Sequence, residues 1–260
     1  WAHRPWICAV HANDVFAQSP RMLRQRLVGA RRIVACSSRA AAAVRDAGVT
    51  APVDVVPHGL PLEKFPCSAA PRQAGAIVAI GRLEPKKGFD LLLEALPRLR
   101  SAFPETRLRL VGWGSQAQPL LRRVRRLGLQ GWVDMSGWQD QATVRAWLRE
   151  ASVCVLPSRV MPNGDRDGMA NVLLEAMALG TPVVTTTAGA AGEAIRDGVN
   201  GLLVPPDDPE TLARAIGRLL ADAGLCRRLA LAARATVEVR FDLRQTARQW
   251  SRVLRKTIDA

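Results

Sequence analysis

Several features that would classify a protein quickly are absent from this 260-residue sequence. No apolar run approaches the roughly 18 residues that a membrane span needs. The first residues lack the charged segment, the apolar segment and the small residues that follow one another in a signal peptide. The missing initiator Met is consistent with a fragment. The five cysteines are odd in number and scattered, which argues against a disulfide framework and a zinc motif. A globular protein of the reducing cytoplasm is expected.

Lysine is also scarce, although the net charge is +14. Arginine therefore supplies nearly all of the positive charge. The electrostatic field of such a net charge attracts nucleic acid, anionic lipid or phosphorylated substrates. The arginine-rich run at 122–126 has no interleaved aromatic residues and no nucleic-acid motif accompanies it, so a solvated basic surface is favoured and no nucleic-acid partner is expected. Peripheral contact with an anionic membrane, at its inner face, stays open.

Short apolar runs alternate with helical patterns along the chain. The runs favour Val, Ile and Leu without alternation, as in strands buried on both faces. Strands are expected at 7–10, 32–36, 53–56, 76–80, 107–111, 132–135, 153–156, 182–185 and 201–204. Helices are expected at 89–103, 119–127, 142–150, 172–179, 209–222, 225–239 and 243–258. This order predicts an α/β fold with a doubly wound parallel sheet.

A domain boundary is expected near residues 65–76, where periodicity lapses and Pro, Ala, Gly and Ser collect. About 65 residues are few for an independent domain of roughly 100–200 residues, so the first segment reads as the end of a larger domain. The predicted division is an N-terminal α/β remnant at 1–65, a linker at 66–75, a complete Rossmann-like unit at 76–240 and a C-terminal helix at 241–260.

Ligands of open parallel sheets gather at the carboxyl ends of strands, so the loops that leave the strands are the first candidates for a site. In "GRLEPKKGFDLLLEAL", Gly81 ends a strand, Arg82 and Lys87 flank a loop, and Gly88 opens a helix. Two cations beside the unpaired N–H groups of a helix start suit a diphosphate. An ordinary exposed, charged loop is the alternative.

A second candidate is "RDGMANVLLEAM", where Asp167 and Glu175 are eight residues apart. Gly168 exposes backbone N–H groups, and Asn171 is expected to cap a helix that is apolar on nearly every side. Burying Glu175 there is unfavourable unless it accepts strong hydrogen bonds, which two vicinal sugar hydroxyls would supply. An ion pair between Glu175 and a neighbouring arginine remains the alternative.

Three ordered motifs together resemble one known family. "GRLEPKKGFDLLLEAL", "GDRDGMANVLLEAMALGTPVVTT" and "AGAAGEAIRDGVNGLLVPPDDPETLARAI" are similar to the C-terminal, donor-binding domain of the family-4 retaining glycosyltransferases. The likeness runs from residue 53 to the end, and "VVPHGLPLEKF" carries His58 where the family usually has Asn. The resemblance implies a GT-B fold, with a complete Rossmann-like C-terminal domain and a truncated N-terminal α/β portion.

The resemblance also implies roles for individual side chains. Arg82 and Lys87 match the pair that holds the nucleotide diphosphate, and Glu175 matches the acid that grips the ribose. Asp167 stands at the first acid of the E-x7-E motif, normally Glu. "GDRDG" also resembles a polysaccharide-synthesis subgroup in which Asp is native. Asp167, Arg82, Lys87 and His11 are the expected catalytic residues.

Further donor contacts are implied by the same resemblance. The segment that would bind sugar and phosphate comprises Gly168, Met169, Ala170 and Asn171. His11, in "VHANDVF", resembles a histidine that faces the donor sugar, and a capping or core histidine is the alternative. The base should lie near Gly137 and Trp138. At Trp138 and at Trp113 a structural tryptophan is favoured over a stacking one.

The implied reaction transfers a hexose from a nucleoside diphosphate sugar to an acceptor hydroxyl, with retention at the anomeric carbon. Cations and a helix end would stabilise the departing diphosphate, so neither a metal ion nor another cofactor is expected. No dedicated base is evident, and the resemblance suggests that the leaving phosphate takes the acceptor proton. A saccharide or lipid-linked saccharide acceptor, in polysaccharide or glycoconjugate synthesis, is expected.

Three other interpretations stay open. "DRD", residues 165–167, fits the metal-binding DxD of another glycosyltransferase fold. "GWGSQA", residues 112–117, with Asp134 resembles a dinucleotide-binding fingerprint. Finally, the chain fits a donor-binding module without transferase activity, because a missing N-terminal region would remove the acceptor site and admit water.

Overall fold

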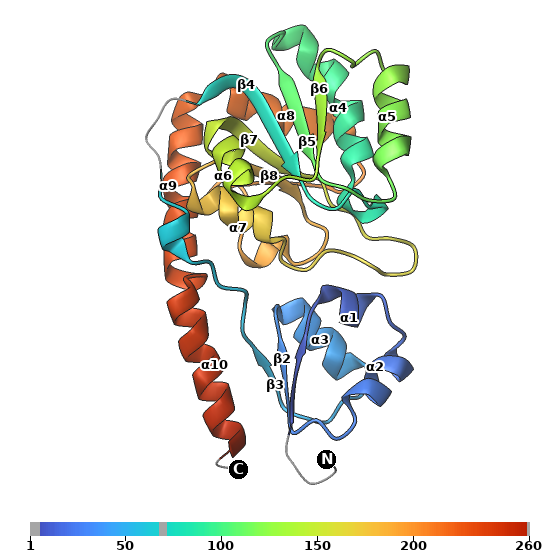
Figure 1. The fold of residues 1–260 in the computed structure, drawn as a ribbon, viewed down its shortest axis with the longest axis vertical. Coiled ribbons are helices and arrows are strands. Elements are labelled where there is room, and N and C mark those ends of the chain that lie inside the picture. The colour runs from blue at the N-terminus through green and yellow to red at the C-terminus, as the bar shows by residue number, and fades with distance from the viewer. Residues whose placement is uncertain (1–5, 68–71, 259–260) are drawn as a thin grey trace.

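The computed structural model describes residues 6–67 and 72–258, which form two parallel sheets (Figure 1). The smaller sheet has the order β1-β2-β3, and the larger has the order β6-β5-β4-β7-β8-β9. The strands are β1 (Ile7–Val10), β2 (Arg32–Ala35), β3 (Val53–Val55), β4 (Gln73–Ile80), β5 (Arg107–Val111), β6 (Val133–Gly137), β7 (Ala151–Leu156), β8 (Val183–Thr186) and β9 (Leu202–Val204). Every strand pair is parallel, so the expected α/β fold is confirmed.

The helices expected after residue 76 are present with bounds shifted by at most two residues. They are α4 (Phe89–Ala102), α5 (Ala117–Arg126), α6 (Gln141–Glu150), α7 (Asn171–Ala178), α8 (Pro209–Ala221), α9 (Ala223–Arg240) and α10 (Leu243–Ile258). Helix α8 shows why local residues predicted where a helix begins. Asp208 accepts a hydrogen bond from the Thr211 amide at 2.9 Å, and Pro209 takes the first helical position.

Three helices before residue 65 were not expected: α1 (Ala12–Phe16), α2 (Pro20–Leu27) and α3 (Ser38–Asp46). Their sequence signals are local caps rather than long apolar stripes. Ser19 accepts from the Met22 amide at 3.3 Å, and Ser37 accepts from the Ala40 amide at 3.1 Å. Helix α1 is a little over one turn long, and α2 and α3 have only eight and nine residues, so each offers few repeats of a helical pattern.

The larger sheet lies between two helical layers. Helix α4 contacts both α5 and α8, whereas α7 contacts both α6 and α9. From β4 the chain moves outward through β5 to β6, then returns to β7 and continues to β9. The direction of winding therefore reverses between the neighbouring strands β4 and β7. Such a reversal opens a crevice at the carboxyl ends of the two strands.

The last two helices connect the two sheets, as Figure 1 shows along one side of the molecule. Helix α9 packs on the larger unit, and Val253 of α10 packs on Val34 and Val56 of the smaller one. Helix α10, which lies within the C-terminal segment predicted at 241–260, thus packs against the first sheet. Part of the predicted linker at 66–75 lies outside the described residues, and β4 begins within that range.

No helix among the described residues is long and apolar enough to cross a bilayer.

Candidate active site

The winding reversal brings together three polar side chains from two loops. Lys87 follows β4, while Ser158 and Asp167 follow β7. The Lys87 Nζ lies 2.9 Å from the Asp167 Oδ2, and the Ser158 hydroxyl donates to the same oxygen at 2.6 Å. Asp167 is only 8% exposed. The crevice therefore holds a buried carboxylate with its own cation, and Lys87 and Asp167, assigned separate roles from the sequence, are in contact.

A second ion pair lies beside the first and fixes the same loop. The Nζ of buried Lys86 lies 2.9 and 3.1 Å from the two carboxylate oxygens of Asp165. Asp165 and Asp167 thus each bind their own lysine. A metal held jointly by the two carboxylates would have to displace both cations, so the geometry disfavours the DxD interpretation.

Two glycines let the strand-end loops touch backbone to backbone. Gly88 and Gly112 have positive φ angles of 67° and 144°. A Cβ on Gly88 would overlap the carbonyl oxygen of Pro157, and one on Gly112 would overlap that of Gly81. The aliphatic stem of Lys87 runs over Gly81, next to Arg82, which is exposed. The two predicted diphosphate ligands therefore sit at the same strand end.

Glu175 lies one turn into α7 and is only 8% exposed. Its hydrogen-bond partner is the side-chain amide of Gln141, at 3.4 Å. Burial raises the pKa of Glu175, while Gln141 and the charge of Arg145 act in the opposite direction. Among the described residues Glu175 has no ion pair within 4.0 Å, so the alternative of a buried Glu–Arg pair is wrong.

The start of α7 differs from the expected cap. Ala170 is the N-cap residue and makes no side-chain capping bond, whereas Asn171 is the first helical residue. Asn171 Oδ1 instead lies 2.9 Å from Nδ1 of His58. The cap prediction is wrong because tertiary packing offers Asn171 a partner on another element. The start of α7 therefore has no side-chain cap for its first N–H groups.

The segment before α7 packs against the smaller unit. An ideal Cβ on Gly168 would lie 2.9 Å from the Cβ of Ala12, so only a glycine fits there without a shift. Met169 is buried and Ala170 is half-buried. The backbone from Gly168 to Ala170 is thereby held between the two units, and its contacts with a donor stay predictions.

His11 is the N-cap residue of α1, and its backbone amide donates to the Asp14 carboxylate at 2.9 Å, so the capping alternative is confirmed and the core alternative is wrong, while its contact with a sugar stays a prediction. It is exposed, precedes α1, and its Nδ1 lies 3.0 Å from Nε2 of His58. His58 in turn contacts Asn171. A chain of three polar side chains therefore links the smaller unit to the start of α7.

The two tryptophans at the strand ends are exposed. Trp138, after Gly137 at the end of β6, is 76% exposed, and Trp113, after β5, is 71% exposed. The prediction of structural tryptophans is wrong for both. Each follows a glycine with positive φ, which turns the chain out of the sheet before the indole can pack. Both rings are free to contact a ligand at this edge.

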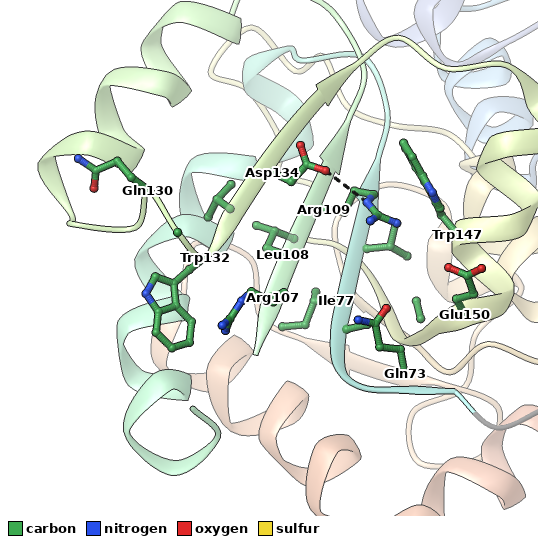
Figure 2. Close-up of a pocket in the computed structure, with 15 residues that line it drawn as sticks. Gln73, Ile77, Arg107, Leu108, Arg109, Gln130, Trp132, Asp134, Trp147 and Glu150 are labelled. Carbon is green, nitrogen blue, oxygen red and sulfur yellow. Dashed lines mark hydrogen bonds and ion pairs between the residues drawn. The ribbon is translucent and has the colours of Figure 1, made fainter. Parts of the chain in front are cut away.

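A hollow of about 490 Å³ lies elsewhere, against the earlier parts of β4, β5 and β6. Figure 2 shows Trp132 beside Arg107 and Trp147 beside Arg109. Arg109 also contacts Asp134, at 3.4 Å. Asp134 therefore lies within β6 and pairs with an arginine, away from the strand end where a dinucleotide ribose would need it. This placement disfavours the dinucleotide interpretation.

Two polar contacts in the crevice were missed from the sequence. Ser158 and Gln141 carry no motif, and only the position of Ser158 two residues after a buried strand could have indicated it. Gln141 reaches Glu175 across 34 residues of sequence, which no local pattern reveals.

Known proteins resemble this chain in sequence and in structure. Residues 74–222 match the model of the family Glycosyl transferases group 1. A glycogen synthase from Mycobacterium tuberculosis is 31% identical over 249 residues, which are 94% of this chain and 58% of that protein. The lipopolysaccharide core biosynthesis glycosyltransferase LpsE of Rhizobium meliloti is 39% identical over 160 residues, 62% of this chain and 44% of that protein.

A crystal structure of Anabaena Alr3699/HepE in complex with UDP-glucose superimposes with a TM-score of 0.86 at 26% identity, over 97% of this chain and 72% of that chain. The chain spans less than three fifths of the length of the two curated relatives above. The family match contains Lys87, Asp167 and Glu175. With its parallel sheets and the structural likeness to GT-B enzymes, the chain belongs to the group 1 glycosyl transferases.

Proposed function

We propose that this chain transfers a hexose from a nucleoside diphosphate sugar to a hydroxyl of a saccharide or lipid-linked saccharide, with retention and without a metal ion. The observation that carries the proposal is the contact of Lys87, Ser158 and Asp167 at the winding reversal. The carboxylate of Glu175, which has no ion pair among the described residues, lies on the adjoining helix. The names of the relatives, a glycogen synthase and a lipopolysaccharide core transferase, support polysaccharide or glycoconjugate synthesis.

The diphosphate is placed at Lys87 and Arg82. Departure of the nucleotide builds negative charge on the phosphate oxygens. The Lys87 cation, held beforehand by Asp167, stabilises that charge without reorganisation, and exposed Arg82 would add a second cation. The uncapped start of α7 adds a partial positive charge. These groups supply the electrostatic role that a divalent ion plays in other transferases.

Asp167 is placed against the hexose. Among the described residues, both of its side-chain contacts use Oδ2. Oδ1 is therefore free to accept a hydrogen bond from a sugar hydroxyl, while Oδ2 holds Lys87 at the phosphate. One carboxylate thus positions the cation and the sugar relative to each other.

Glu175 is placed at the ribose. Its buried carboxylate has only a long hydrogen bond from Gln141. Two vicinal ribose hydroxyls would each donate to one oxygen and compensate for the desolvation of the charge. Trp138 and Trp113, exposed at the neighbouring strand ends, would border the base.

His11 is placed on the opposite side of the donor, where its imidazole would hydrogen-bond a sugar hydroxyl near the reacting carbon. In the proposed same-face displacement, the acceptor oxygen bonds the anomeric carbon as the phosphate oxygen leaves. That phosphate oxygen takes the acceptor proton, so no protein base is required.

Calorimetry of the chain against a panel of nucleoside diphosphates tests binding, followed by assays for donor hydrolysis and sugar transfer. Tight binding with transfer supports the proposal. Binding without transfer would identify a nucleotide-sugar-binding module, and the absence of any binding would overturn both.

Peripheral contact with anionic lipid is part of the proposal. Helix α10 exposes Leu254 and Ile258 among exposed basic residues, which include Arg252, Arg255 and Lys256. Sedimentation with vesicles that contain phosphatidylglycerol tests this, and equal sedimentation with neutral phosphatidylcholine vesicles would contradict an electrostatic contact.

A further inference from the structure

The three adjacent strands of the smaller sheet each lead to one potential metal ligand. His11 directly follows β1, Cys36 directly follows β2, and His58 follows β3 by three residues. The carboxyl ends of parallel strands meet at one edge of a sheet. One ligand atom from each side chain lies within 4.8 Å of the other two. Within residues 6–67 and 72–258, no other group of three or more His, Cys, Asp or Glu side chains meets this condition.

The distances are close to those around a tetrahedral ion. Zn–N bonds of about 2.0 Å and Zn–S bonds of about 2.3 Å place two ligating nitrogens roughly 3.3 Å apart and nitrogen and sulfur roughly 3.6 Å apart. His11 Nδ1 and His58 Nε2 are 3.0 Å apart. The two imidazole nitrogens therefore need to move apart only slightly. Because the ligand atoms lie within 4.8 Å of one another, the Cys36 sulfur needs to approach by about 1.2 Å at most.

The surroundings hold one of the ligands, His58, in the required state. Because Asn171 Oδ1 accepts from Nδ1–H of His58, the lone pair of His58 lies on Nε2, which faces His11. Histidines that bind metals usually donate their other N–H in this way. Burial raises the pKa of the Cys36 thiol, so an arriving metal ion has to displace its proton, although the backbone amide of Ala12 donates to the sulfur and acts in the opposite direction.

The cluster is accessible from outside. His11, Cys36, His58 and Asn171 all line a cavity of about 650 Å³ between the smaller sheet and α10. His11 is exposed and Cys36 is buried, so the cluster has one side toward solvent and one toward the protein. An ion could enter without unfolding, and water could occupy a fourth position.

We propose that His11, Cys36 and His58 bind one thiophilic divalent cation of the Zn²⁺ class. On binding, three bonds form from the metal to Nδ1 of His11, Sγ of Cys36 and Nε2 of His58. The Cys36 thiol proton goes to solvent, and the His11 proton moves from Nδ1 to Nε2, which breaks the hydrogen bond between the two imidazoles. No oxidation or reduction is involved.

The site is separate from the lysines of the crevice. If His11 faces the donor sugar, as the proposed function has it, the ion holds its imidazole away from the sugar hydroxyl. Zn²⁺ is then an inhibitor of transfer, and the transfer step itself uses no metal. The ion acts as a regulator that enters from the smaller unit.

Titration of the metal-free, reduced 260-residue chain with Co²⁺ tests the site directly, without donor or acceptor. The expected result is one Co²⁺ per chain with a thiolate-to-cobalt charge-transfer band, which Zn²⁺ displaces. Cys36→Ser should abolish the band and weaken Zn²⁺ binding at least ~100-fold. His58→Asn should weaken it at least ~10-fold, as should Asn171→Ala through loss of the orienting bond.

Cys67→Ser is the matched control, because Cys67 is an exposed cysteine outside the cluster, and it should leave the band and the affinity unchanged. Thermal unfolding without metal shows whether each variant folds, and half-buried His58 gives a second test if Cys36→Ser fails to fold. Absence of the thiolate band, or Zn²⁺ affinity unchanged in both Cys36→Ser and His58→Asn, overturns the site. Because the titration contains no donor, failure of the proposed transferase activity would leave this result intact.

Discussion

Lys87 and Asp167 come from the loops after β4 and β7 and meet through a contact of 2.9 Å between Nζ and Oδ2. The pair lies where the winding of the larger sheet reverses. It holds a cation at the point where parallel sheets bind their ligands, and it connects the proposed phosphate site to the proposed sugar site.

Replacing Lys87 with Ala should weaken nucleoside diphosphate binding by roughly 10- to 100-fold, because a charge-assisted hydrogen bond is lost. The rate of transfer should fall by about two to three powers of ten, since leaving-group charge is no longer neutralised. Arg82→Ala should act in the same direction. Calorimetry and transfer assays measure both effects.

Lys64→Ala is the matched control, because Lys64 is an exposed lysine in the short helix at Leu62–Lys64, and it should change neither quantity. Unchanged diphosphate binding in both Arg82→Ala and Lys87→Ala would contradict the assigned phosphate site.

Asp167→Asn should separate the two proposed roles of this side chain. Removal of the charge frees Lys87 from its carboxylate partner, so affinity for a nucleoside diphosphate without sugar should stay the same or increase. The rate of transfer should fall, because the sugar contact and the position of Lys87 are both altered. If diphosphate affinity falls more than the rate of transfer does, Asp167 does not act on the sugar.

Glu175→Gln should have opposite effects on stability and on binding. Burial raises the pKa of Glu175 in the folded protein. The folded state therefore holds more protons than the unfolded state between the ordinary glutamate pKa, about 4.3, and the raised value, so stability falls as pH rises through that window. Glu175→Gln should raise Tm at pH 7, and the gain should vanish below about pH 4.

Nucleotide affinity should fall in the same variant by roughly 10- to 100-fold, since hydrogen bonds to a charged acceptor contribute about 1.5–3 kcal/mol. Thermal unfolding across pH and calorimetry give the two readouts. Glu105→Gln, at an exposed turn, is the control. A loss of stability larger than the loss of nucleotide affinity would show that Glu175 is structural.

Glu193→Ala should loosen the contact between the two units. The Glu193 carboxylate accepts from the backbone amides of Ser38 at 2.8 Å and Arg39 at 2.9 Å, at the start of α3. Loss of such a helix-end contact costs about 1 kcal/mol, which lowers Tm by about 2–4 °C for a chain of this size. Small-angle scattering should show a larger radius of gyration. Partial recovery in Glu193→Gln is expected, and an unchanged Tm in Glu193→Ala would show that the contact does not hold the units together.

Local patterns in the sequence were sufficient to predict most helices and strands of the larger unit. Buried strands such as β7 are apolar throughout, and α8 has its cap, its first-turn proline and its apolar face within one short stretch. The same local logic placed Arg82, Lys87, Asp167 and Glu175 in loops and a helix at the strand ends. These features depend on neighbours a few residues away, so they can be predicted from the sequence alone.

Partnerships across long sequence separations were decided only by the tertiary structure. Lys87 and Asp167 are 80 residues apart, and His58 and Asn171 are 113 apart. Whether Asn171 capped its helix or bonded an imidazole, and whether Trp138 was buried or exposed, depended on how the two sheets and α10 packed. The sequence determined which chemical groups reach the edges of the sheets. Packing decided which of them touch, because a side chain takes its partner from whatever element the fold brings within hydrogen-bonding distance.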